Sequence, residues 1–294
     1  MPMTESHQPG ADVADLEAGL DALSTEKPRR ASVGRRLRRS ALPPLVAVAV
    51  VLGTWQLFAM LEIKPSYVVP GPLDVWHTFS AEWAQGTPQE AVWNSLRRGF
   101  IGFAASIVIG TLIGVVVARV RPIRTAVGPV LSGLQSLPSV AWVPAAIIWF
   151  GLSDAAIYMV VLLGAVPSIA NGLVAGVDQV PPLFLRVGKV LGAGRLATVR
   201  HVLLPAALPG YIAGLKQGWA FSWRSLMAAE LITFSPELGL GLGQLLSMGR
   251  DLSDMSLVMA SIIVILFVGI AVELLLFAPV ERRILRSRGL RLEA

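Results

Sequence analysis

Long stretches without charged residues are the feature that most limits how this chain of 294 residues can fold. The first, Pro43–Leu61, has 19 residues without Asp, Glu, Lys or Arg, and a helix of that length crosses a hydrocarbon core about 30 Å thick. It lies far from the N-terminus and no small-residue cleavage site follows, so we expect a retained span rather than a signal peptide. Five further apolar stretches follow at about Gly99–Ala118, Ala126–Phe150 (interrupted by Pro138 and Pro144), Ala155–Val177, Pro209–Ile232 and Ser256–Phe277. The fourth of these five holds Lys216, Arg224 and Glu230, and the last holds Glu273. The sequence therefore predicts an all-α membrane protein with six transmembrane helices.

The composition agrees with a lipid environment. Only 15% of the residues are charged, whereas soluble domains carry about 25%. Because cysteine is absent, disulfides and thiolate metal sites are excluded. The three histidines, His7, His77 and His201, lie far apart and form none of the short spacings that metal sites use.

The positions of the basic residues predict the orientation of the chain. With a cytoplasmic N-terminus, most of the 25 Lys and Arg fall in predicted cytoplasmic segments, and only Lys64, Arg97, Arg98 and Arg250 fall in outer ones. This bias follows the positive-inside rule. Both termini are therefore predicted to be cytoplasmic, and topology rather than nucleic-acid binding accounts for the basic pI.

The same charges divide the chain into segments. Residues 1–41, acidic at first and then basic, are predicted to be a mostly disordered cytoplasmic tail with a basic membrane anchor. Residues 42–280 form the six-helix domain, with a long cytoplasmic loop at about 178–207. Residues 281–294 form a basic cytoplasmic tail.

Small residues recur every four positions on two of the predicted spans. The second span carries Gly102, Ser106, Gly110, Gly114 and Ala118, and the fifth carries Gly210, Gly214, Gly218 and Ser222. Such stripes let helix backbones approach closely in lipid. A subunit or gating interface and ordinary packing within one bundle both remain open interpretations.

The sequence contains no catalytic or nucleotide-binding motif. We find no Gly-x-Ser-x-Gly, no His-Glu-x-x-His and no Walker A sequence. The run Gly239-Leu-Gly241-Leu-Gly243 follows no predicted strand, so turns explain it better than a nucleotide loop does. If this protein pumps a substrate, its ATPase is another chain.

The cytoplasmic loop is the most informative segment. From Leu185 to Leu203, apolar residues alternate with basic ones, which predicts an amphipathic helix, a bend at Gly192, and a second helix that Pro205 ends. A helix of this kind on the cytoplasmic face offers an apolar ridge to the groove of a partner.

This loop resembles the EAA motif of binding-protein-dependent ABC importer permeases. The motif reads Glu-Ala-Ala, three residues, Gly, nine residues, Ile-x-Leu-Pro; here Gly192 takes the glycine position and Val202–Pro205 the end. Arg186, Val187 and Gly188 stand where the family has Glu-Ala-Ala. The segments Leu204–Gly210 and Trp223–Glu230 are similar to the permeases that import aliphatic sulfonates, taurine or nitrate, and the resemblance covers about residues 65–285.

The resemblance implies a type I importer (MetI-like) fold in the plasma membrane, with five core helices and an extra first span. It also implies a homodimer of permeases, two ABC ATPase subunits that bind ATP and Mg, and an extracytoplasmic binding protein. This chain would hold no cofactor and would not be an enzyme. The residues expected to couple to the ATPase are Arg186, Val187, Gly188, Gly192, Ala193, Val202, Leu204 and Pro205.

Charged residues inside the fifth span are the candidates for a substrate pathway, because ionisable groups in hydrocarbon cost about 2.5–3.5 kcal/mol each and usually face a cavity or a partner. The candidates are the charged residues Lys216, Arg224 and Glu230, together with the adjacent Trp223. Lys216 and Arg224 would give the pore a positive lining for an anion. The alternatives are that Lys216 reaches the cytoplasmic interface, and that Arg224 pairs with Glu230 or Glu273.

The preferred interpretation is an importer subunit for a small anion, first an aliphatic sulfonate and then taurine or nitrate. One alternative keeps the importer and changes the cargo to a thiamine or riboflavin precursor. Another is an ion-coupled secondary transporter, which would need an internal repeat or a midplane ion site. An intramembrane enzyme is disfavoured because no nucleophile or metal set is visible.

Overall fold

The computed structural model describes residues 33–61, 65, 67–235 and 238–286, and the side chains of residues 33–41 and 195–196 are not described. The chain divides into two compact units, residues 1–61 and 62–294. A mostly disordered tail was predicted for residues 1–41, and residues 1–32 of that segment lie outside the described part of the chain. Residues 33–41, the basic end of that segment, are helical.

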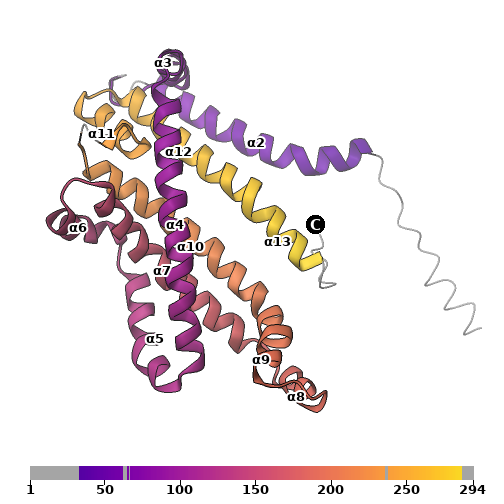
Figure 1. Cartoon of the computed structure of the whole chain (residues 1–294). Helices are drawn as coiled ribbons and strands as arrows, with labels where there is room; N and C mark the ends of the chain where they lie inside the picture. Colours follow the sequence, from indigo (N-terminus) through magenta and orange to yellow (C-terminus); the bar gives the residue numbers. More distant parts are fainter. Residues whose placement is uncertain (1–32, 62–64, 66, 236–237, 287–294) are drawn as a thin grey trace, which may run out of the picture. The chain divides into compact units, whose positions relative to one another are not determined.

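The first unit consists of the helix α2, Val33–Met60 (Figure 1). Its segment Leu42–Met60 is apolar throughout, and its side chains are largely exposed within the unit. Pro43 and Pro44 lie inside the helix. The predicted first span is therefore present, but its helix begins ten positions before Pro43.

The second unit is helical in all its regular elements across the described residues. In chain order these are α3 (Pro72–Gln85), α4 (Thr87–Arg119), α5 (Arg121–Ser136), η1 (Ser139–Trp142), α6 (Val143–Phe150), α7 (Asp154–Asp178), α8 (Pro182–Val190), α9 (Arg195–Thr198), η2 (Val199–Leu203), α10 (Leu204–Ile232), α11 (Leu242–Asp251), α12 (Met255–Val272), η4 (Glu273–Phe277) and α13 (Ala278–Arg286).

Among the described residues, four helical stretches are long and apolar enough to cross a membrane: Leu42–Met60, Thr87–Arg119, Asp154–Asp178 and Met255–Arg286. Helix α10 has 29 residues, enough for about 43 Å, and carries the three charges that make it less apolar. The predicted bounds agree closely for α7. They are too short for α4, which begins at Thr87, and for the last span, whose helix continues to Arg286.

The predicted third span is a bent pair rather than one straight helix. Helix α5 and the segment η1–α6 meet at an angle of 98°. The break precedes Pro138, whose ring disfavours the helical conformation of the residue before it, and Leu137 is indeed extended. The interruption predicted at Pro138 is confirmed, whereas Pro144 lies in the first turn of α6 and does not break the helix.

Helix α7 is the centre of the unit, and both small-residue stripes pack against it. A Cβ at Gly102 or Gly110 of α4 would come within 2.9 Å of Val161 or Ile169. On the other side, a Cβ at Gly172 would lie 2.3 Å from the Cα of Gly214 on α10. Of the two interpretations of the stripes, packing within one bundle is confirmed for these residues.

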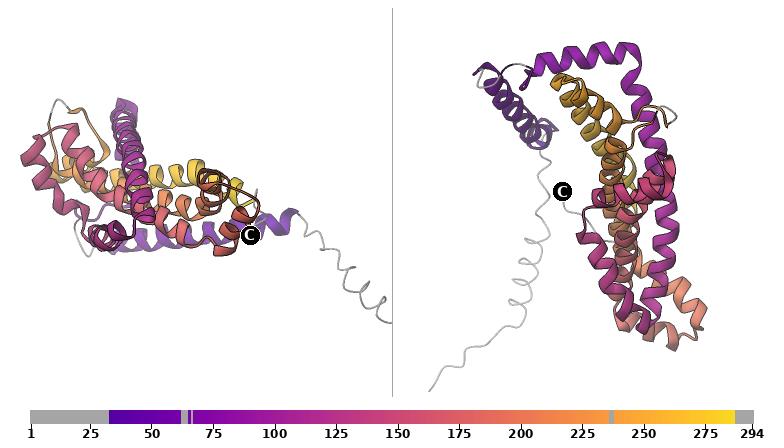
Figure 2. Two further views of the ribbon diagram at one scale, coloured as in Figure 1. Left: turned by 60° about the horizontal axis from the view of Figure 1, so that its bottom comes forward. Right: turned by 90° about the vertical axis from the view of Figure 1, so that its left-hand side faces the viewer.

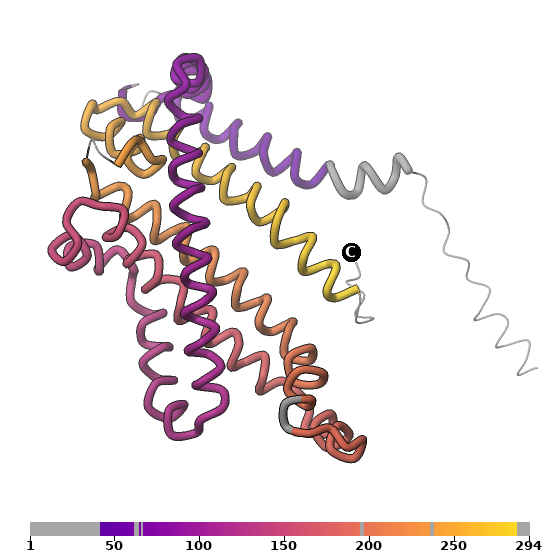
Figure 3. Tube along the Cα trace, viewed as in Figure 1, coloured from indigo at the N-terminus to yellow at the C-terminus, as the bar shows by residue number. Residues whose placement is uncertain are grey.

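The unit has two ends, which we call the α11 end and the α8 end. Helices α3, α6 and α11 lie at the first, and α8 and α9 lie at the second (Figures 1 and 2). Helix α10 runs beside α7 from one end to the other (Figure 3). Helical geometry is unbroken from Arg195 through η2 into α10, so one continuous element joins the α8 end to the α11 end.

Candidate functional site

The predicted cytoplasmic loop folds as α8, a tight turn and α9. Gly192 has φ +77°, a conformation that favours glycine. Its N–H donates to the carbonyl of Lys189 (3.0 Å), and the N–H of Ala193 donates to the carbonyl of Gly188 (2.9 Å). The bend predicted at Gly192 is confirmed, and the backbone bonds around it explain why it is sharp.

Gly188 and Val202 hold the two arms of the loop together. Gly188 is buried, and a Cβ there would lie 3.4 Å from Cγ2 of Val202 on η2. The opposite face of α8 is open: Val190 is 86% exposed and Leu191 is 80% exposed. Leu183, Phe184 and Val187 are exposed too, and so are Arg186 and Lys189. We call Leu183, Phe184, Val187, Val190 and Leu191 the loop tip.

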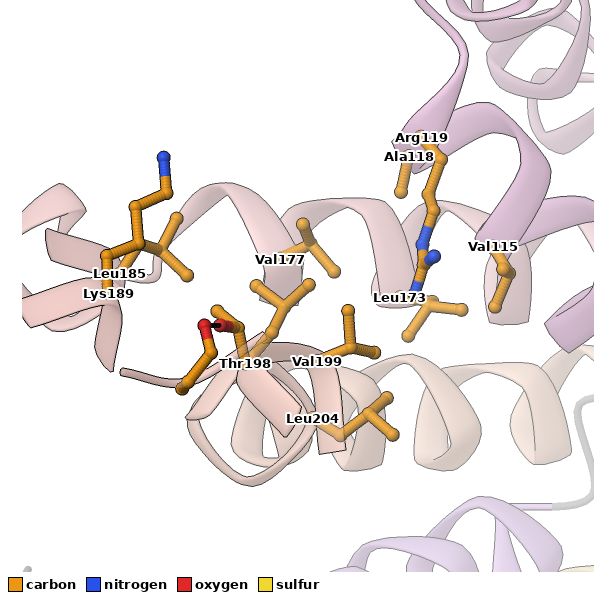
Figure 4. A pocket seen from close by; sticks show the side chains of 12 residues that line it. Val115, Ala118, Arg119, Leu173, Val177, Leu185, Lys189, Thr198, Val199 and Leu204 are labelled. Atoms are coloured by element: carbon orange, nitrogen blue, oxygen red, sulfur yellow. Dashed lines mark hydrogen bonds between the residues drawn. The ribbon is translucent and has the colours of Figure 1, made fainter. Parts of the chain in front are cut away.

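A cavity of about 370 Å³ lies behind the loop, lined mainly by apolar side chains of α4, α7, α8 and η2. Leu173 and Val177 of α7 lie on one side, and Val199 and Leu204 lie on the other (Figure 4). Arg119 and Lys189 contribute its charged groups. The loop therefore rests on α4 and α7 without filling the space between them.

The expectation that Pro205 ends a helix is wrong. Leu203 and Leu204 keep helical dihedrals, and Pro205 lies in the first turn of α10. The turn before it, η2, is a π-helix in which the N–H of Leu204 donates to the carbonyl of Val199. This wider turn accommodates a proline, which has no N–H to donate.

Lys216 of α10 pairs with two carboxylates from other helices. Its ammonium is 2.7 Å from Glu273 of η4 and 3.1 Å from Glu281 of α13. The three side chains are between 36% and 38% exposed. Glu273, which sequence reasoning considered as a partner for Arg224, belongs to Lys216 instead.

Arg224 is exposed and points away from the core. Its guanidinium donates to the carbonyl of Ala220 on its own helix and lies 5.1 Å from the ring centre of Phe221. Within the described part of the chain no carboxylate pairs with it, so the alternative of pairing with Glu230 or Glu273 is wrong.

Trp223 is buried in an aromatic cluster. Its ring stacks on Trp219 with centroids 6.0 Å apart, and Trp219 in turn contacts Phe100, Phe103 and Phe277. The cluster fastens α4, α10 and η4 together. Trp223 is placed to shape the core beside Arg224 rather than to face open space.

Glu230 forms a fully buried ion pair with Arg98 of α4. The guanidinium Nη1 lies 3.0 Å from Glu230 Oε1, and both side chains have 0% exposure. Arg98 also donates to Asp154 at the start of α7 (2.8 Å) and to the carbonyl of Leu238. We call Ser95, Arg98 and Glu230 the buried network; Asp154, whose side chain is 36% exposed, pairs with Arg98 at its edge.

The buried network holds the loop that leads into α11. Glu230 Oε2 accepts from Ser95 Oγ (2.7 Å) and from the N–H of Gly243 (3.1 Å), and Ser95 Oγ accepts from the N–H of Leu242 (2.8 Å). Two of the N–H groups at the start of α11 that lack an intrahelical partner are thus satisfied by other helices, at a position where the helix dipole favours a carboxylate. A Cβ at Gly241 would lie 2.6 Å from the carboxyl of Glu230. The glycines at 241 and 243 therefore allow the start of α11 to approach Glu230 closely.

Sequence reasoning missed Arg98, Ser95 and Asp154. Arg98 was counted as an outer-segment charge because it stands beside Arg97 at the predicted start of a span. The usable signal was Glu230, since a carboxylate near the end of an apolar stretch needs a cation, and Arg98 stands near the matching end of another stretch.

Together these features define a helical membrane subunit with an exposed apolar loop at the α8 end and no nucleotide-binding motif in its sequence. Residues 106–286 match the family model described as the binding-protein-dependent transport system inner membrane component. The chain belongs to this family of ABC transporter permeases. It is a transport subunit and not an enzyme, and ATP hydrolysis resides in a separate chain.

Named relatives agree with this placement. The taurine transport system permease protein of Escherichia coli K12 is 28% identical over 258 residues, which cover 86% of this chain and 92% of that protein. A Bacillus subtilis permease protein named for aliphatic sulfonates transport is 27% identical over 276 residues, covering 94% and 98%. A solved structure of the MetNI methionine ABC transporter in an inward-facing conformation matches with a TM-score of 0.57 at 20% identity, covering 69% of this chain and 98% of that one. The fold is therefore that of MetI-like permeases.

Proposed function

We propose that two copies of this chain form the translocation path of an ABC importer for small organic anions that carry a sulfonate group. The α8 end faces the cytosol, where ATPase subunits that bind ATP and Mg dock on the loop tip. An extracytoplasmic binding protein delivers the cargo at the α11 end. The observation that carries the proposal is the exposed apolar loop tip.

The loop tip has the chemistry of a docking element. Val190 and Leu191 are among the most exposed apolar residues of the described chain, and clustered apolar exposure on an aqueous face marks an interaction site. A short amphipathic helix of this kind inserts into a groove of a partner. Arg186 and Lys189 beside it favour an acidic rim on that groove.

Arg224 supports an anionic cargo. Lys216 and Arg98 are neutralised by carboxylates, whereas Arg224 is exposed and keeps its charge available. A cation on a spanning helix that faces neither the core nor a carboxylate attracts an anion and repels a cation. Taurine and aliphatic sulfonates, for which the two relatives are named, both carry a sulfonate.

The cargo is tested on the binding protein, because that protein selects what reaches the permease. Retention of an alkanesulfonate or taurine by the binding protein of the assembled importer supports the proposal. Retention of nitrate alone, or of a thiamine or riboflavin precursor, replaces the sulfonate by that cargo.

The docking of the ATPase is tested with Leu191→Asp, which places a charge on the loop tip. We expect the amount of ATPase that copurifies with the tagged permease to fall by at least about tenfold, because removing a central apolar contact typically costs 2 kcal/mol or more. The associated chain is identified by its Walker A sequence and by ATP hydrolysis in the purified complex.

Leu252→Asp is the matched control, since Leu252 is also an exposed leucine but lies at the α11 end. We expect this variant to keep the ATPase. Equal recovery of the ATPase with Leu191→Asp and with the wild type would contradict docking at the loop tip.

A further inference from the structure

Backbone groups of Leu238 to Gly243, at the end of the loop and the start of α11, are bonded to side chains of other helices. The carbonyl of Leu238 accepts from Arg98, the carbonyl of Leu240 accepts from Asn94 (2.9 Å), and the N–H groups of Leu242 and Gly243 donate to Ser95 and Glu230. Each of these partners lies on α4 or α10. Helix α11 is therefore attached to the bundle through buried polar groups.

Glu230 is the member of this network that belongs to α10. Its carboxyl fills the space in front of Gly241, and a Cβ at Gly243 would lie 2.6 Å from Cβ of Glu230. Because these groups are buried, moving α11 away from α10 would leave donors and acceptors without partners, which is unfavourable. The start of α11 must follow the end of α10.

The other end of the same helix is the docking loop. Arg195 to Ile232 is one continuous helical element, and packed helices move as rigid bodies or slide in small steps rather than deform freely. A displacement of the loop tip by the ATPase thus reaches Glu230 along α10.

We propose that Glu230, held by Arg98, is a positioning residue that passes the movement of the docking loop to α11, so that the state of the ATPase sets the conformation at the α11 end. The inference rests on the proposed function, because it requires an ATPase at the loop tip. The competing explanation is that the buried network only stabilises the fold.

The absence of cysteine offers a direct test. Leu252 follows α11 and is 67% exposed, so Leu252→Cys provides a single labelling site next to that helix. The rate of its modification by a water-soluble maleimide is measured in the complete importer with its ATPase, with and without ATP and Mg plus vanadate.

The test compares Leu252→Cys alone with the same variant carrying Glu230→Gln or Glu273→Gln. Both second changes turn a paired carboxyl into an amide, but Glu273 pairs with Lys216 and lies outside the buried network. In the parent and with Glu273→Gln, we expect ATP and Mg plus vanadate to change the labelling rate by at least about fivefold. This is the lower limit of typical coupling between two sites. With Glu230→Gln the change should vanish while the ATPase still copurifies and hydrolyses ATP.

Three results would overturn the inference: a nucleotide effect that persists with Glu230→Gln, no effect in the parent, or equal loss with both amides. If Glu230→Gln does not accumulate, Ser95→Ala decides, because it removes the hydrogen bonds of Ser95 Oγ to Leu242 and to Glu230 Oε2 and keeps the Arg98–Glu230 ion pair. An undiminished nucleotide effect there counts against the inference. Failure of the ATPase to copurify with the parent would instead refute the proposed function.

Discussion

Helix α10 contributes to two groups of ion-paired side chains, which differ in almost every physical respect. Near its α11 end, Glu230 and Arg98 are both at 0% exposure. In the half nearer α8, Lys216 lies between Glu273 and Glu281, and all three are more than a third exposed. The first pair belongs to a network that reaches backbone groups of a loop, whereas the second joins side chains alone.

The difference shows which charged side chains a helical membrane protein needs for its stability. A buried pair need not stabilise a fold relative to apolar residues, but removing one partner leaves the other charged and desolvated. An exposed pair leaves its remaining member accessible to water or to lipid headgroups. The two pairs should therefore respond very differently to the same change.

The largest effect is expected for Arg98→Met, which leaves Glu230 without its cation. Breaking a buried pair in this way costs about 3–5 kcal/mol. We expect little of the variant to accumulate in the membrane, and what remains should aggregate at a clearly lower temperature in detergent.

Arg97→Met is its control, since Arg97 is the neighbouring arginine and is exposed. It should accumulate like the wild type. Similar behaviour of the two variants would show that the buried network does not depend on the charge of Arg98.

A smaller effect separates two glycines at the opposite ends of the unit. Gly243→Ala would bring a Cβ to 2.6 Å from Glu230, whereas Gly188→Ala would bring one to 3.4 Å from Val202. Overpacking costs about 1–3 kcal/mol, while alanine is favoured over glycine inside a helix by about 1 kcal/mol. We expect Gly243→Ala to lower the aggregation temperature and Gly188→Ala to leave it unchanged or raise it. Equal decreases would show that the α8 end is packed as tightly as the α11 end.

Much of the fold was accessible from the sequence, because apolar length and turn residues are local signals. The bounds of α7 and the bend at Gly192 followed from such signals. The two helices of the loop at about 178–207 followed from its pattern of basic and apolar residues. Its docking on an ATPase stays a prediction.

What was missed depends on contacts between distant parts of the chain. Arg98 is charged and stands beside Arg97, so nothing local reveals that it is buried against Glu230, which is 132 positions away. Pro205 was misjudged for a related reason. Proline usually ends a helix, but here the π-helix η2 before it lets the helix continue.

The smallest effect on stability is expected for Lys216→Met. This variant is informative when it is compared with Arg224→Gln, which removes the other positive charge of α10. Exposed pairs contribute at most about 1 kcal/mol, and Arg224 has no carboxylate partner among the described residues, so both variants should accumulate normally.

Uptake of the cargo should nevertheless differ between the two variants. Lys216 is already neutralised by Glu273 and Glu281, whereas the free charge of Arg224 is the one that can attract an anion. Uptake of the cargo, measured at equal membrane abundance, should persist with Lys216→Met and disappear with Arg224→Gln. Loss of uptake with Lys216→Met alone would instead place the positive lining of the path at the lysine and make its two carboxylates part of the transport route.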